Sequence, residues 1–165
     1  MTRRSRAREI ALQVLFQDDL NPGGNPAAAD EFLRRRLRTP ELVDLSRALV
    51  AGVRRNRAEL DALIEKTAEN WSLGRMAVTD RNVLRLGAYE ILFSDTPDPV
   101  AINEALELAK RYGSAQSAQF VNGILDRLMR EKGLQARTEL PSSVHRRGLS
   151  VDGAANEKQE TENDE

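Results

Sequence analysis

The sequence predicts an all-α fold of about seven helices, arranged as two small packed helical bundles. Apolar residues recur three and four positions apart over most of residues 1–133, which is the period of a helix with one buried face. No β-branched, alternating run competes with this pattern. Proline, glycine and capping residues separate the periodic segments from one another.

The first three helices are bounded by clear signals. The first is expected over residues 4–20, and the breaker Asn21-Pro22-Gly23-Gly24-Asn25-Pro26 ends it. A second helix follows over residues 27–37. Thr39 and Pro40 then predict an N-cap and the first position of a third helix. Asn56 is expected to cap a continuation through Ile64, either as a separate helix or after a kink.

The remaining helices form the second half of the domain. The helix that begins near Thr79 has apolar residues on most sides and is therefore expected to be central. The next helix opens at Asp98-Pro99 and stops at Gly113, a predicted left-handed cap. The last starts at Ser117 and is expected to end by Gly133. Trp71, between two helical blocks, is interpreted as a core anchor.

Charge is sorted along the chain, although the formal net charge is only −1. Residues 149–165 hold six acids and one lysine, a net of −5, so residues 1–148 carry +4. The sequence therefore predicts a helical domain over residues 1–133 and a disordered, polar and acidic tail over 134–165. The tail is expected to aid solubility, and shielding of a basic surface is the alternative.

Composition excludes several kinds of site. The chain has no cysteine and a single histidine, His145, so thiol catalysis, disulfides and multi-histidine metal sites are ruled out. Glu90, Glu104 and Glu107 lack a companion group for acid–base work. We therefore expect no catalytic residue, cofactor or metal. No apolar run approaches the roughly 18–20 residues that span a bilayer, so a cytoplasmic protein without membrane contact is expected.

The strongest physical signal is a group of arginines at the start of the first helix. Cations at a helix N-terminus are unfavourable by about 0.3–1 kcal/mol each. Their presence there indicates an anionic partner, because guanidinium groups bind phosphates in bidentate fashion. A solubilising terminus is the alternative. The residues of this group are Arg3, Arg4, Arg6 and Arg8. A second arginine-rich run over residues 31–57 is interpreted as a solvated face.

The segment Phe120-Val121-Asn122-Gly123-Ile124-Leu125-Asp126 is unusual because it places glycine inside a helix, where it costs about 1 kcal/mol relative to alanine. Close helix packing is the favoured explanation, and close approach of a ligand is the alternative. Asn122 and Asp126 are four residues apart and share a face. Their amide and carboxylate groups suit base edges or ribose hydroxyls.

Four segments together resemble the NusB family of bacterial transcription antitermination factors. They are the arginine-rich segment 3–9, the segment 80–90 with Asp80-Arg81-Asn82-Val83-Leu84-Arg85, the segment 100–110 with Ala101-Ile102-Asn103-Glu104-Ala105, and the segment 120–126. The resemblance runs in order over about residues 3–130. Ser5 departs from it, because the family often has a basic residue at that position.

The resemblance implies a non-enzymatic RNA-binding factor. With the ribosomal protein NusE, such factors bind boxA, a single-stranded element of nascent ribosomal RNA leaders. With other Nus factors on RNA polymerase, they support processive transcription and ribosomal RNA maturation. By position, the four arginines, Phe120, Asn122 and Asp126 would contact RNA, with Phe120 also a core candidate. Tyr89 and Glu90 would face NusE. Homodimers also occur in the family.

Three other hypotheses stay open. A NusB-like domain also begins some ribosomal RNA cytosine methyltransferases, but no catalytic domain follows here, so only a detached fragment would fit. A helical protein–protein adaptor predicts that alanine at Arg6 and Arg8 leaves every interaction intact. An enzyme with Glu104 or Asp126 as general base lacks a second catalytic group.

Overall fold

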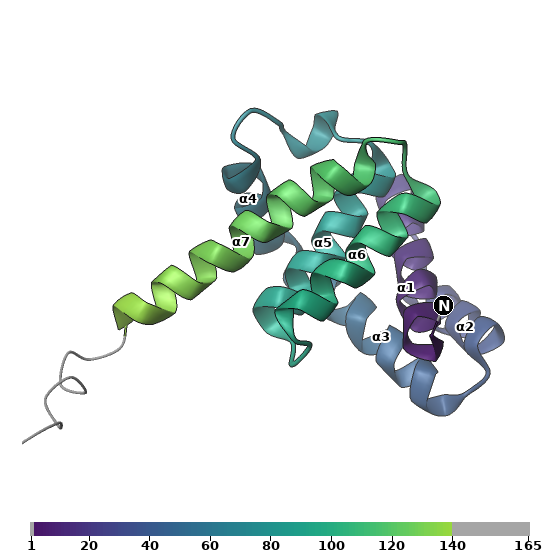
Figure 1. Ribbon diagram of the computed structural model, residues 1–165. Helices are drawn as coiled ribbons and strands as arrows, with labels where there is room; N and C mark the ends of the chain where they lie inside the picture. Colours follow the sequence, from purple (N-terminus) through teal and green to yellow (C-terminus); the bar gives the residue numbers. More distant parts are fainter. Residues whose placement is uncertain (1, 140–165) are drawn as a thin grey trace, which may run out of the picture.

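A computed structural model of the chain describes residues 2–139, and within these residues every regular secondary-structure element is a helix (Figure 1). The predicted all-α class is confirmed. The helices are α1 (Arg3–Leu20), α2 (Pro26–Leu37), α3 (Pro40–Arg55), α4 (Arg57–Ala68), α5 (Val78–Phe93), α6 (Asp98–Tyr112) and α7 (Ser117–Glu139), with a short 3-10 turn, η1 (Leu73–Arg75), between α4 and α5.

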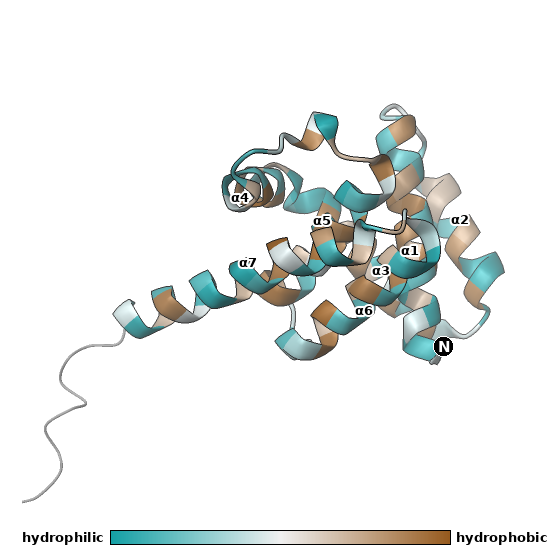
Figure 2. Ribbon diagram, turned by 45° about the horizontal axis from the view of Figure 1, so that its top comes forward, coloured by the Kyte–Doolittle hydropathy of each residue, from teal (hydrophilic) through white to brown (hydrophobic). Residues whose placement is uncertain are grey.

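The helices form two groups that meet at α5. Helices α1, α2 and α3 pack against one another, and α5 packs against α4, α6 and α7. Helix α5 also contacts α1 and α3, so it joins the two groups. Its residues 82–88 are all buried, which confirms its predicted central position. In Figure 2 the apolar segments of α5 lie in the middle of the molecule.

One glycine of α5 sets how closely the second group packs. A Cβ atom at Gly87 would lie 2.7 Å from a Leu125 methyl group on α7 and 3.2 Å from the Ala105 Cβ on α6. These distances are tighter than ordinary side-chain contact, so a larger residue at position 87 would require Leu125 and Ala105 to shift, and glycine lets α6 and α7 lie this close to α5. This approach fixes where α7, with its Asn122–Asp126 segment, lies on the surface.

Most of the predicted helix starts are confirmed. The Thr2 hydroxyl accepts a hydrogen bond from the backbone N–H of Ser5 at 3.1 Å, which caps α1. Asn25 caps α2 in the same way through the N–H of Ala27. Pro40 occupies the first turn of α3, as predicted. Asn56 separates α3 from α4. Its side chain donates back to the carbonyl of Gly52 in α3, so it makes no capping hydrogen bond at the start of α4.

The predicted left-handed cap at Gly113 is wrong. The residue has φ −92° and ψ −169°, which is extended backbone. Glycine is needed there for space, because a Cβ would collide with the side chain of Ser117. The Ser117 hydroxyl lies against this turn and accepts a hydrogen bond from the N–H of Ser114 at 2.8 Å. Gly113 thus lets the α6–α7 turn close tightly.

The predicted end of the last helix at Gly133 is also wrong, because α7 continues to Glu139. Gly133 lies in the helix with open space around it and without a positive φ. The stretch after it, Leu134-Gln135-Ala136-Arg137, consists of good helix formers that carry the helix past the glycine. The rest of the predicted tail, from residue 140 onward, lies outside the described residues.

No helix within residues 2–139 is long and apolar enough to cross a membrane.

Candidate nucleic-acid interface

Three of the four predicted arginines are presented on the first turn of α1. Arg3 and Arg4 are exposed, and the Arg6 side chain is 40% exposed. Arg3 makes one long hydrogen bond, 3.4 Å, to the hydroxyl of Thr39. Arg6 pairs with Glu9 at 3.0 Å. We call Arg3, Arg4 and Arg6 the arginine arm.

Arg8 differs from the arginine arm because it is buried. Its Nε donates to both carboxylate oxygens of Glu90 at 3.0 Å, and its Nη2 donates to Glu90 Oε1 at 2.9 Å. The Thr96 hydroxyl donates to the same carboxylate at 3.0 Å. The two predictions that Arg8 holds phosphate and that Glu90 faces a partner are therefore corrected. In this buried pair the guanidinium and the carboxylate bind each other, and the pair holds α1 against α5.

Sequence spacing contains the signal for this burial. Arg8 precedes Leu12 and Leu15 by four and seven positions, and both leucines are buried. Residues at this spacing share one helix face, so Arg8 lies on the apolar face of α1. A neighbouring link supports it: the Ser5 hydroxyl donates to Glu104 of α6 at 2.8 Å. Arg8 and Ser5 together hold the helix that carries the arginine arm.

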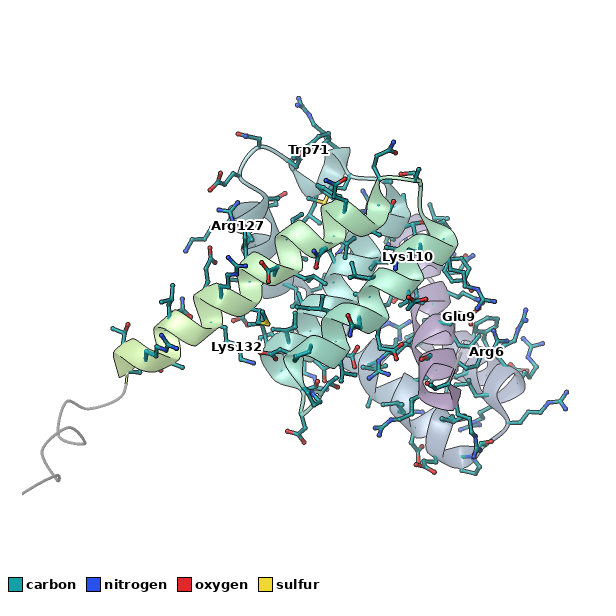
Figure 3. All side chains as sticks on the ribbon, viewed as in Figure 1. Arg6, Glu9, Trp71, Lys110, Arg127 and Lys132 are labelled. Atoms are coloured by element: carbon teal, nitrogen blue, oxygen red, sulfur yellow. The ribbon has the colours of Figure 1, made fainter. Side chains whose placement is uncertain are left out.

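A second cluster, centred on Glu9 next to the arginine arm, was not predicted from the sequence. Glu9 is 2% exposed and lies between Arg6, the Tyr112 hydroxyl, which donates to it, and Arg111 at 3.7 Å. Burial raises the pKa of Glu9, but the hydrogen bonds from Tyr112 and Arg6 outweigh it, so the pKa lies below its ordinary value. Glu9 therefore stays ionised and orients Arg6. Figure 3 shows Arg6 and Glu9 together on α1.

The α7 segment presents polar groups at the surface, as expected, but its glycine does not serve close helix packing. Asn122 and Gly123 are exposed, and a Cβ at Gly123 would meet no atom within 4 Å. The favoured packing explanation for Gly123 is therefore wrong. Asp126 is half-buried and pairs with Arg130 at 2.9 Å. The surface of α7 around Asn122 is thus open, while Asp126 already has a cation partner.

Two aromatic residues meet beside this surface. Phe120 is half-buried against the core, and its ring lies edge-on to Trp71 with centroids 6.0 Å apart. Trp71 is 52% exposed, so its interpretation as a core anchor is wrong. The loop that follows α4 leaves it outside the packed helices. Both predicted roles of Phe120, core and surface contact, are compatible with this position.

The predicted partner face contains Tyr89 and a residue that the prediction missed. Tyr89 is half-buried, with its ring over Gly52 of α3, where a Cβ would collide with it. It stacks on Phe93, which is 41% exposed, with centroids 6.2 Å apart and the rings 25° from parallel. Tyr89 and Phe93 thus form an aromatic face at the end of α5, whereas Glu90 is buried.

The second arginine run is distributed over several ion pairs. Arg34 pairs with Asp30 at 2.9 Å, and Arg54 pairs with Asp18 at 2.6 Å. These pairs agree with the predicted solvated face.

Arg35 and Arg36 line a hollow of about 750 Å³ between α1 and α2, together with Phe32. The Arg36 guanidinium lies 5.2 Å from the Phe32 ring centroid.

The arginines of the segment 80–90, Arg81 and Arg85, also have a structural role. Asp19 at the end of α1 accepts hydrogen bonds from Arg81 at 2.6 and 2.7 Å, from Asn82 at 2.9 Å and from Arg85 at 3.1 Å. Burial raises the pKa of Asp19, but Arg81, Asn82 and Arg85 outweigh it and lower the pKa to about 2. This network ties the C-terminal end of α1 to α5.

These features define the class of protein: an all-α domain in two helical groups that presents a cationic arm and an open polar helix face. Among residues 2–139 no group of three histidine, cysteine, aspartate or glutamate residues is placed to hold a metal ion.

Comparison with known proteins gives the family. The NusB family model matches residues 5–130. A transcription antitermination protein NusB of Anaeromyxobacter dehalogenans strain 2CP-1 is 48% identical over 128 residues, covering 77% of this chain and 90% of the relative. One of Bdellovibrio bacteriovorus is 41% identical over 130 residues, covering 78% and 96%. The chain belongs to the NusB family.

Solved structures agree with this placement. The structure of T. maritima NusB is 40% identical, with a TM-score of 0.71 over 85% of this chain and 99% of that one. A chain in a structure of the antitermination factors NusB and NusE in complex with dsRNA is 29% identical, with a TM-score of 0.71 over 79% and 98%.

Proposed function

We propose that this chain is a transcription antitermination factor that binds boxA-like single-stranded RNA of nascent ribosomal RNA leaders together with NusE. The observation that carries the proposal is the arginine arm, exposed on the first turn of α1. Cations there oppose the helix dipole, and an anionic ligand would relieve this. Family membership and the NusB–NusE–dsRNA structure of a relative support RNA as that ligand.

Specific roles for the site residues follow from their exposure. Arg3, Arg4 and Arg6 hold phosphates, as point contacts that position the strand. Asn122 reads a base edge from the open face of α7, and Phe120 supports that face. Asp126 joins the readout if it exchanges Arg130 for a base amino group or a ribose hydroxyl. Arg8 positions the arginine arm through Glu90 and contacts no RNA.

The partner surface that we propose for NusE is the aromatic face of Tyr89 and Phe93. Half-exposed, stacked aromatic rings are typical of the centres of protein–protein interfaces. Other Nus factors and RNA polymerase then join through the RNA and NusE. A homodimer through the same face is the alternative assembly. We propose no catalytic activity and a cytoplasmic location, in keeping with a family named for transcription antitermination.

The experiment compares RNA affinity across salt concentrations for the unaltered chain and for the double variant Arg3→Ala/Arg4→Ala. Each phosphate contact to a single strand contributes about 0.7 to the slope of log affinity against log salt. We expect the double variant to bind more weakly and to lose about 1.4 from that slope. Neither side chain is buried, so the fold is unaffected.

The matched control is Arg55→Ala/Arg137→Ala, which removes the same charge from exposed positions on α3 and α7. It should leave the slope and the affinity nearly unchanged. If both double variants lost the same affinity, the binding would reflect net charge alone. If neither lost affinity, Arg3 and Arg4 would not be RNA contacts. If the unaltered chain bound no RNA, the adaptor hypothesis without an RNA role would replace the proposal.

A further inference from the structure

Trp71 is the chain's single tryptophan, and more than half of it is exposed, in the loop between α4 and η1. A tryptophan ring is the largest apolar surface that one residue can present, and such rings are normally covered or bound. The only aromatic ring in contact with it within residues 2–139 is Phe120, which meets it edge-on. That contact leaves 52% of Trp71 exposed.

The surroundings of Trp71 form a shallow hollow of about 430 Å³. It is lined by Glu65, Glu69, Asn70, Trp71, Ser72 and Arg75. The two carboxylates are already engaged: Glu65 accepts from the N–H of Leu73 at 3.1 Å, and Glu69 accepts from Arg127 at 2.7 Å. Arg75 is exposed and makes no ion pair with any residue from 2 to 139. The hollow therefore offers an aromatic wall, an amide and a cation.

This set of groups fits an unpaired nucleotide. Unstacked bases of single-stranded RNA stack on aromatic side chains, amides bond to base edges, and arginine binds the phosphate. A docking protein would also bury an indole, but the hollow is lined mainly by polar groups. Phe120 links the hollow to the open α7 face around Asn122.

We propose that Trp71 is a base-stacking platform, and that the hollow beside it holds one nucleotide of the single-stranded RNA, with its phosphate on Arg75. The inference rests on the proposed RNA-binding function and adds a contact beside Phe120, the first residue of the α7 segment. Stacking accepts any base, so Trp71 contributes affinity, whereas Asn122 contributes sequence selection.

The first test uses the intrinsic fluorescence of the unaltered chain, which reports Trp71 alone because no other tryptophan is present. Short boxA-like RNA is titrated into the protein while binding is followed in parallel by the anisotropy of a labelled strand. We expect tryptophan fluorescence to be quenched with the same midpoint as the anisotropy change. Binding by anisotropy without any fluorescence change would overturn the inference and leave the proposed function standing.

The second test uses Trp71→Leu and Trp71→Phe. Leucine keeps apolar area but cannot stack, so we expect a loss of about 5- to 150-fold in affinity, whereas phenylalanine should retain most of it. The salt slope should not change, because no charge is removed. Phe32→Leu, which removes a half-buried aromatic ring of α2 outside both proposed binding surfaces, is the matched control and should bind RNA as the unaltered chain does.

Circular dichroism and thermal melts of each variant establish that the fold is intact. Equal affinity of Trp71→Leu and the unaltered chain would overturn the inference. If the unaltered chain bound no RNA by anisotropy, the proposed function itself would fail, and the inference with it. If Trp71→Leu weakened NusE capture and left RNA affinity unchanged, the hollow would be a protein-docking site instead.

Discussion

At the scale of single residues, the ion pair of Arg8 and Glu90 decides how the N-terminal arginines divide their work. The pair is nearly completely buried, with side-chain exposures of 6% and 2%. A bidentate guanidinium–carboxylate pair is geometrically rigid, so it fixes the helix on which Arg3, Arg4 and Arg6 lie. One arginine of the four therefore holds the fold, and the other three remain available to a ligand.

Removing one member of this pair should be severe. Arg8→Ala leaves the Glu90 carboxylate buried without its cation, so we expect a loss of about 3–5 kcal/mol in the free energy of unfolding. Urea denaturation measures it, with Arg4→Ala as the exposed control, expected within about 0.5 kcal/mol of the unaltered chain.

The double change Arg8→Met/Glu90→Leu removes both charges and keeps apolar volume, so it should recover most of the lost stability. Equal stability of Arg8→Ala and Arg4→Ala would contradict the buried position of Arg8. A double variant no more stable than Arg8→Ala would mean that the pair supplies more than charge compensation.

At the scale of the elements, α1 and α5 are joined at both ends, by Arg8–Glu90 and by the network around Asp19. The Asp19 pKa of about 2 lies below the ordinary value of 3.8. A carboxyl with a lowered folded-state pKa stabilises the fold above its unfolded-state pKa and loses that contribution as the pH falls toward the folded-state pKa. The Asp19 contribution is therefore complete above about pH 5.

We predict that Asp19→Asn costs about 2 kcal/mol at pH 7, estimated from the lowered pKa alone. The difference between the variant and the unaltered chain should shrink between about pH 4 and pH 2, as Asp19 of the unaltered chain becomes protonated. Urea midpoints measured across this pH range provide the check. A difference that stays constant from pH 7 to pH 2 would show that the Asp19 charge is not what stabilises the junction.

Helix α7 offers a second test at this scale, because it contains two glycines with open space around them, Gly123 and Gly133. Alanine at either position should raise the free energy of unfolding by up to about 1 kcal/mol, since it is the better helix former and meets no neighbour. If RNA approaches α7 closely at Gly123, only Gly123→Ala should weaken RNA binding.

Thermal melts and RNA titrations of the two variants separate these effects. A gain in stability with a loss of affinity at Gly123, and a gain without loss at Gly133, would support the proposed RNA surface. Equal RNA affinity for both variants would contradict close approach of RNA at Gly123.

At the scale of the whole molecule, the sequence predicted the helices well because their signals are local. Thr39-Pro40 and Asp98-Pro99 mark real helix starts, and the apolar surround of residues 82–88 marks the central helix. The prediction failed where tertiary contacts decide. Gly113 is required because a larger residue would collide with Ser117, not because of its backbone angles. Gly133 lies inside α7 because the residues around it favour a helix.

The candidate site could be predicted only in part, because local signals report exposure but not which side chains pair in the folded structure. The exposure of Arg3, Arg4 and Asn122 follows from helix position alone. Arg8 and Glu90, in contrast, pair with each other across 82 residues of sequence, which no local pattern reports. Trp71 lies in a loop, where no periodicity reports burial. Phe93 was missed because one aromatic residue near a helix end carries no pattern of its own.

The whole molecule, with NusE, is proposed to recognise boxA-like RNA. The most direct measurement is the affinity for a boxA-like strand and for a scrambled strand of the same composition, each with and without NusE, at physiological salt. We expect the boxA-like strand to bind more tightly and NusE to increase its affinity further. Equal affinity for the two strands, unchanged by NusE, would contradict it.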